Sequence, residues 1–87
     1  MGKRIMNSED CYNAIEARFG APKSAHLDEN GDEVDAWGWR DIGVILHTGA
    51  DGSFSITVTR GEKNVGYWTH ASSSKELVNM MLCHMRG

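Results

Sequence analysis

A strict alternation of side chains between Ser53 and Thr59 limits what this chain can fold into more than any other feature of the sequence. Phe54, Ile56 and Val58 are separated by hydroxyl-bearing residues. A period of two places the three apolar side chains on one face of an extended segment. This pattern is typical of an antiparallel strand with one buried and one solvated face. The segment therefore predicts a β-sheet that must be covered on one side.

The residues that follow predict a hairpin and a C-terminal helix. Residues 60–64 reverse the chain, and residues 65–70 return as a second strand. Ser73 followed by Glu76 is a capping box, which marks the start of a helix. The apolar positions of this predicted helix are Leu77, Val78, Met81, Leu82 and Met85.

Another helix is predicted over residues 8–19. Asn7 or Ser8 caps it, and carboxylates in its first turn suit the helix dipole. Gly20 and Pro22 end it, because glycine accepts a left-handed conformation and proline cannot continue a helix. The apolar stripe of this helix, at helical spacing, consists of Cys11, Ile15 and Phe19.

The middle of the chain predicts one further strand, over residues 34–48. Alternate apolar residues in its second half point toward the core, and the glycines at 38 and 43 indicate a bulge or a close backbone approach. Upstream, residues 23–27 either pair with residues 33–37 as an edge strand or belong to a long acidic loop, and we favour the loop. The core residues expected in the strand are Ile42, Val44 and Leu46.

These elements predict one α+β domain over residues 1–87, with residues 1–7 flexible. We expect a three-stranded antiparallel sheet, with a possible fourth edge strand, and two helices on one face, in the order helix, strand, strand, strand, helix. A chain of 87 residues leaves no room for a second hydrophobic core.

Charge and composition narrow the classes of function. The net charge is −3, and nine basic residues are scattered along the chain, whereas a nucleic-acid binder normally carries a basic stripe. No run of 18 apolar residues offers a membrane span, and no export signal is evident. We therefore expect a cytoplasmic protein that does not bind membranes and has a protein partner with a basic surface. Cys11 and Cys83 are expected to be reduced thiols in the core.

The turn signal Asn30–Gly31 lies within a run of five carboxylates. Part of this run alternates as the first ligands of an EF-hand do, but the sixth position of such a loop is Glu33 rather than glycine and the twelfth is Trp39 rather than glutamate. We therefore predict no metal site. The run is either an ordinary solvated turn or an acidic patch that imitates nucleic-acid phosphates and binds a basic surface. The carboxylates are Asp28, Glu29, Asp32, Glu33 and Asp35.

Two tryptophans, Trp37 and Trp39, follow the acidic run and would share one face of a strand. They either cap the core between sheet and helices or, if turned outward, anchor a partner beside the acidic residues. We include both tryptophans with the five carboxylates as predicted partner-binding residues.

Enzymatic chemistry is not indicated by the sequence. No arrangement of nucleophile and base, no phosphate loop and no cofactor fingerprint is present. The four histidines and two cysteines lack the close spacing of a zinc site. We predict a non-catalytic protein with no catalytic residues and no cofactor. The methionines of the last helix leave open whether the chain is a monomer or a homodimer through that helix, as in a small structural subunit.

From Phe54 to Met85 the sequence resembles the second half of a double-stranded RNA-binding domain. The resemblance consists of the hydroxyl-rich strand, the segment Val65-Gly66-Tyr67 and the serine-capped helix. It implies binding to duplex RNA, which that family achieves with lysines at the start of the last helix. Here that place carries one lysine beside a glutamate. The residues that the resemblance would assign to nucleic acid are Arg60, Lys63 and Lys75.

In size, charge and architecture the chain also resembles the small inhibitors that phages use against host defences, of which anti-CRISPR proteins are the best-known group. That resemblance implies an acidic surface that occupies the nucleic-acid-binding surface of a host defence ribonucleoprotein complex. Our leading hypothesis is therefore an inhibitor or regulator that acts by protein–protein contact, and the alternatives are the RNA-binding module and the dimeric structural subunit.

Overall fold

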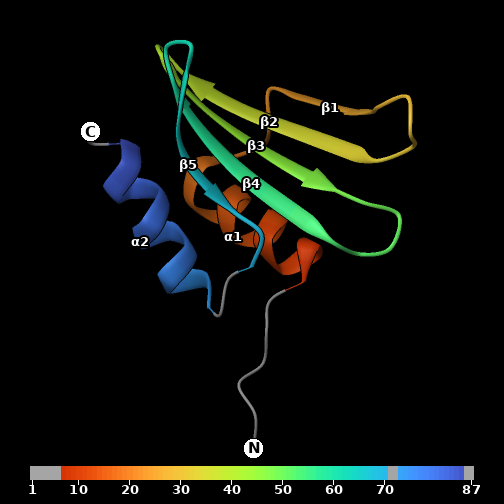
Figure 1. Ribbon diagram of the computed structural model, residues 1–87. Coiled ribbons are helices and arrows are strands. Elements are labelled where there is room, and N and C mark those ends of the chain that lie inside the picture. The colour runs from red at the N-terminus through yellow and green to blue at the C-terminus, as the bar shows by residue number, and fades with distance from the viewer. Residues whose placement is uncertain (1–6, 71–72, 86–87) are drawn as a thin grey trace, which may run out of the picture.

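The computed structural model describes residues 7–70 and 73–85. An antiparallel sheet of five strands, paired in the order in which they follow one another along the chain, carries two helices on one face (Figure 1). The predicted flexibility of residues 1–7 lies outside the described residues, except at Asn7. The elements in chain order are α1 (Ser8–Phe19), β1 (Ser24–Leu27), β2 (Glu33–Trp39), β3 (Ile42–Thr48), β4 (Phe54–Arg60), β5 (Lys63–Trp68) and α2 (Ser74–Met85).

The ends of both helices follow their local sequence signals. Asn7 caps α1: its side chain accepts from the Asp10 N–H at 2.8 Å, and Asp10 accepts in return from the Asn7 N–H at 3.4 Å. Gly20, at φ 90°, closes the other end. At α2 the Ser73 hydroxyl accepts from the Glu76 N–H at 3.1 Å, so the predicted cap is confirmed.

The α+β class and the two helices are confirmed, but the predicted number of strands is wrong. The single strand expected over residues 34–48 is a hairpin of β2 and β3, with Trp39 opposite Ile42. The chain reverses at Arg40–Asp41, where Arg40 has a positive φ of 51°. A two-residue reversal of this kind normally carries glycine or asparagine, so an arginine there gives no turn signal.

The preference for a loop over residues 23–27 is also wrong, because β1 forms. Its residues pair with β2 from Ser24 opposite Ala36 to Leu27 opposite Glu33, and the Lys23 N–H extends the ladder to the Ala36 carbonyl at 2.7 Å. All four residues of β1 are exposed. A strand without a buried side chain has no apolar alternation, and this explains why the pattern missed it.

The core lies between the sheet and the two helices, as the alternation in β4 predicted. Trp37 joins it: its ring centroid lies 5.7 Å from that of Tyr12, and its Nε1–H donates to the Gly20 carbonyl at 2.8 Å. The opposite, open face of the sheet carries the hydroxyls of β4. The fully buried apolar side chains are Cys11, Ile15, Val44, Leu46, Ile56, Val58, Leu77 and Met81.

Of the two alternatives predicted for Gly38 and Gly43, a bulge or a close approach, no bulge occurs there in the β2–β3 register, and Gly43 makes a close approach, to a side chain of β4. A Cβ on Gly43 would lie 2.7 Å from Thr59 Oγ1. The register shift occurs elsewhere, between Val58 and Thr59 opposite β5.

The two thiols differ in environment. Cys11 is buried, as predicted, and burial, with a smaller contribution from Asp10, raises the pKa of its thiol to about 11. Cys83 is exposed, so its predicted place in the core is wrong: it lies on the solvent side of α2. The side chain of Met85 lies outside what the structure describes.

Candidate interaction site

The β1–β2 turn, residues 28–32, is held by the side chain of its first residue. Oδ1 of Asp28 accepts from the backbone N–H groups of Asn30 at 2.9 Å and Asp32 at 3.0 Å. The Asp28 N–H donates to the Asp32 carbonyl at 2.9 Å, and Gly31 takes a positive φ of 83°. The turn signal at Asn30–Gly31 is therefore confirmed, and the turn's acidic groups are presented on an ordered backbone.

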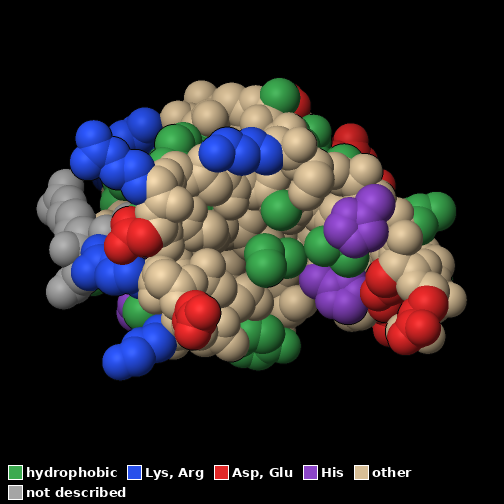
Figure 2. Space-filling model, turned by 90° about the horizontal axis from the view of Figure 1, so that it is seen from above, with side chains coloured by type: hydrophobic (Ala, Val, Ile, Leu, Met, Phe, Trp, Pro, Cys, Tyr) green, Lys and Arg blue, Asp and Glu red, His purple; other side chains and the backbone are tan. Residues whose placement is uncertain are grey.

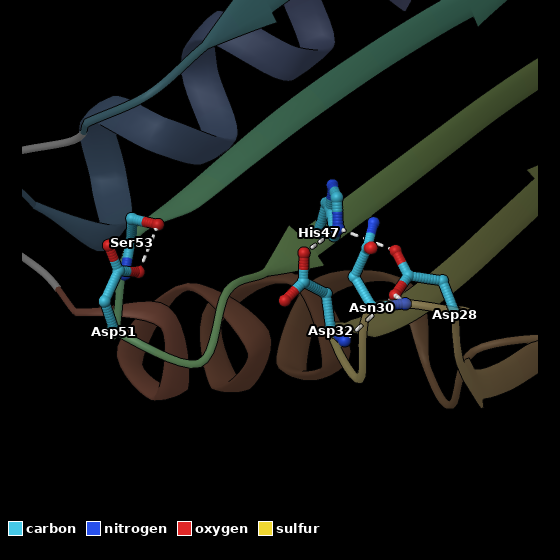
Figure 3. Close-up of polar contacts among 6 residues, drawn as sticks. All are labelled: Asp28, Asn30, Asp32, His47, Asp51 and Ser53. Atoms are coloured by element: carbon cyan, nitrogen blue, oxygen red, sulfur yellow. Dashed lines mark hydrogen bonds and ion pairs between the residues drawn. The ribbon is translucent and has the colours of Figure 1, made fainter.

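His47 of β3 joins this turn on the open face of the sheet (Figure 3). Its Nε2 lies 3.1 Å from Asp32 Oδ2 and 3.3 Å from Asp28 Oδ2. The backbone donors of Asp32 and Asn30, with a contribution from His47, lower the pKa of Asp28. The imidazole Nε2–H can donate to either carboxylate, so His47 helps to hold the inner side of the turn.

Asp28, Asp32 and His47 also form a group whose ligand atoms all lie within 4.8 Å of one another. Histidine and carboxylate are donors that transition metals accept. Sequence reasoning missed this group because it compared Asp28 and Asp32 only with residues near them in the chain. His47 is placed by the pairing of Val34 with His47 across β2 and β3, and no spacing motif contains that information.

Glu33 and Asp35 point to the helix-covered side of the sheet, so the five carboxylates do not form one patch. Asp35 is only 2% exposed, and its Oδ2 has no hydrogen-bond partner among the described residues. Burial raises the pKa of Asp35 to about 6. A side-chain hydrogen bond with Glu33 and the charge of Glu33 add to this shift, and His26 opposes it. Asp35 was predicted as a surface carboxylate; the period of two instead places it with Trp37 in the interior.

The two tryptophans predicted to anchor a partner lie in different environments. Trp37 is 3% exposed, so it offers no surface to a partner. Of the two roles predicted for it, it has the one in the core. Trp39 is 36% exposed and its ring lies 4.9 Å from that of Phe19. It ends β2, whereas the acidic turn precedes the start of β2, so the two features lie at opposite ends of that strand.

The large apolar side chains that are most exposed are Leu27 and Tyr67, at 68% and 62%. Leu27 directly precedes the acidic turn, and Tyr67 lies on the open face because it pairs with Thr57. The sequence suggested that either Tyr67 or Trp68 faces away from the helices, and Tyr67 does. Leu27 was missed because its segment was interpreted as a loop.

The basic residues assigned to nucleic acid do not come together. Arg60 and Lys63 are cross-strand partners at the β4–β5 turn, whereas Lys75 lines a groove between the helices with Arg18 and Asp10. On the open face, most lysine and arginine side chains lie toward one end, with carboxylates among them, and a denser group of carboxylates lies beside two histidines toward the other end (Figure 2). The basic groups of this face are therefore concentrated away from that group of carboxylates.

No protein-family model matches this chain, and neither a curated protein nor a solved structure does. Within residues 7–70 and 73–85, neither helix is long and apolar enough to cross a membrane.

Proposed function

We propose that this chain is a non-catalytic protein-binding module whose acidic β1–β2 turn docks on a basic surface of a protein partner. The observation that carries the proposal is the ordered turn itself. Asp28, Glu29 and Asp32 stand together beside the exposed Leu27, at the acidic end of a molecule whose basic groups lie mainly at the other end of the open face.

Three properties support this role. Carboxylates on a turn already fixed by hydrogen bonds lose little conformational freedom on binding. Their charge steers a basic partner and excludes acidic ones. Leu27, next to Asp28 in the chain and opposite Glu33 across the strands, adds an exposed apolar group of the kind that anchors many protein interfaces.

The partner surface that fits best is one that normally binds nucleic acid, because it offers closely spaced lysines and arginines to an acidic turn. Many of the small phage inhibitors that the chain resembles in size, charge and architecture use an acidic surface in this way on host ribonucleoprotein complexes. At the turn, the proposal keeps the predicted contact residues Asp28, Glu29 and Asp32 and adds Leu27, while the buried Trp37 is left out.

The test compares two variants with the same change in charge. Glu29→Lys with Asp32→Asn alters the acidic turn and keeps Asp28, which holds the backbone. Glu62→Lys with Asp41→Asn is the matched control at the other end of the sheet, where both residues are exposed. Proteins captured from a host extract are identified by mass spectrometry. We expect the turn variant to lose partners that the wild type and the control retain.

Duplex RNA separates this proposal from the nucleic-acid alternative. We expect the wild-type chain to show no tight binding to duplex RNA. Tight binding that weakens steeply with salt, and that is lost in Arg60→Gln with Lys63→Gln, would overturn the proposal in favour of an RNA-binding module. Capture that is equal for the turn variant and the control would also overturn it.

A further inference from the structure

A cavity of about 480 Å³ opens between the start of α1 and the first three strands. Tyr12 of α1 forms one wall, and Glu33 and Asp35 of β2 form the facing one. Glu33 is exposed and Asp35 is buried, so the first stands at the mouth and the second at the floor. The remaining lining residues are Ser8, Glu9, Ala25, Leu46 and Thr48.

The charges that line this cavity have one sign. Glu9, Glu33 and Asp35 carry carboxyl groups, and within residues 7–70 and 73–85 no lysine or arginine lines the cavity. The N-terminus of α1 is nearby, but its capping box with Asn7 and Asp10 already uses donors there, which leaves a weaker attraction for anions. The cavity is therefore suited to a cation.

The buried side chain of Asp35 is a second indication that the cavity binds a ligand. Its side chain is 2% exposed and Oδ2 finds no hydrogen-bond partner among the described residues. A buried acceptor without a donor is costly, and such atoms in folded proteins call for an explanation. A donor group entering the cavity would supply Oδ2 with the partner that none of the described residues provides.

We propose that this cavity receives the guanidinium group of an arginine side chain from the partner protein. Asp35 would accept from it at the floor and Glu33 at the mouth. The planar fork of a guanidinium can donate to two carboxylates at once and stack on the ring of Tyr12, which a compact ammonium cannot do equally well. Oδ2 is screened from solvent, so the proposal requires the exposed Glu33 side chain to move aside as the guanidinium enters.

The location connects this cavity to the acidic turn. Glu33 pairs with Leu27 across β1 and β2, so a partner seated on Leu27 and the turn brings its neighbouring side chains to the mouth. The inference rests on the proposed function, since it assumes that the arginine belongs to a basic protein surface. It adds the chemical group that the interface recognises.

The test uses a small probe and therefore does not require the partner to be known. Nα-acetyl-arginine methylamide is titrated into the isotope-labelled full-length chain, and its neutral citrulline counterpart serves as the matched ligand. Concentrations extend to roughly 50 mM, the range in which a single side-chain contact saturates. We expect amide shifts confined to the lining residues, at least about tenfold weaker for citrulline.

Two variants complete the test. Asp35→Asn keeps the shape of the side chain and removes its charge, and Glu33→Gln does the same at the mouth, in case the first variant alters the fold. Each is expected to weaken arginine binding about tenfold or more. Glu62→Gln, on the β4–β5 turn, is the matched control and should bind as the wild type does.

Four outcomes would overturn the inference: no shift with arginine, equal binding of citrulline, equal binding of the corresponding lysine amide, or shifts produced by Mg²⁺ or Ca²⁺ but not by arginine. A loss of partner capture in the acidic-turn variant together with any of these results would leave the proposed function intact. If the cavity bound arginine specifically but the acidic-turn variant captured the same partners as the wild type, the proposed role of the turn would be contradicted and the arginine site would not.

Discussion

At the scale of single residues, Asp35 shows how much a side chain's chemistry depends on its surroundings. On a loop the Asp35 carboxyl group would be ionised and solvated, but here it lines a cavity beside α1 together with Glu33 and Tyr12. Burial raises its pKa to about 6, because a charge in an apolar environment is poorly solvated. A group that costs stability at neutral pH is typical of a functional site.

This raised pKa predicts a pH-dependent stability. The folded-state pKa of Asp35, about 6, exceeds its ordinary value of 3.8, so the folded protein binds the proton more tightly. The associated stability is present below pH 4 and is lost as the pH rises through 6. We expect Asp35→Asn to raise the free energy of unfolding at pH 7.5 by about 1–3 kcal/mol and to change it little at pH 4.

Urea unfolding at both pH values measures this effect. Asp41→Asn, the same substitution at an exposed position, is the control for the substitution itself. The groups around Asp35 are Glu33 on β2, His26 on β1 and Tyr12 on α1, and Asp35→Asn leaves all three unchanged. A stability difference that is the same at pH 4 and pH 7.5 would contradict the assignment.

Asp28 has the opposite behaviour, because backbone donors of Asn30 and Asp32 stabilise its charged form and lower its pKa. We expect Asp28→Ala to lower the melting temperature more than Asp28→Asn, which keeps an acceptor oxygen for the two N–H groups. Calorimetry of both variants, with Glu29→Ala as the exposed neighbouring control, measures the difference. Equal melting temperatures for the two Asp28 variants would show that the hydrogen bonds do not hold the turn.

At the scale of elements, the β2–β3 hairpin contains the least expected conformation in the chain. Arg40 is the only residue other than glycine with a positive φ among the described residues. A residue with a side chain in that region loses about 1–2 kcal/mol of stability. Glycine avoids this conformational energy, but it also increases the entropy of the unfolded chain, which offsets part of the gain.

We therefore expect Arg40→Gly to stabilise the protein by about 0.5–1 kcal/mol, measured by urea unfolding. Asp41→Gly in the same turn is the control: Asp41 has no positive φ, so glycine there should destabilise. If both glycine variants changed stability in the same direction, the left-handed conformation of Arg40 would be refuted.

The helices and strands also differ in how clearly their own residues predict them. α1, β4, β5 and α2 combine an apolar pattern with a cap or a turn, and each signal depends on residues within a few positions of one another. β1 has four exposed residues and exists because Ala36 and its neighbours offer it a paired edge. A strand that owes its formation to its partner cannot be recognised from its own composition.

At the scale of the whole molecule, the basic side chains of the open face gather toward one end and a dense group of carboxylates lies toward the other (Figure 2). Leu27 is the apolar group beside the acidic end, and at 68% exposure its removal should change the free energy of unfolding by less than about 0.5 kcal/mol. We expect Leu27→Ser nevertheless to weaken partner binding by about tenfold or more.

Tyr67→Ser is the matched control for this prediction, because Tyr67 is similarly exposed but lies on the open face rather than beside the turn. Capture of the partner by the two variants is compared at equal concentration, with unfolding measured in parallel. A stronger effect of Tyr67→Ser than of Leu27→Ser would move the interface from the turn to the open face.

The sequence by itself determined the class of fold, the two helices with their caps, the turn at Asn30–Gly31 and the alternating core of β4. These follow from interactions between residues close in the chain. Only the tertiary structure decided that Trp37 and Asp35 are buried, that His47 joins Asp28 and Asp32, and that the acidic run is divided between the two sides of the sheet. Those outcomes depend on which strands pair, in which register, and on which face the helices lie, and no local pattern of side chains contains that information.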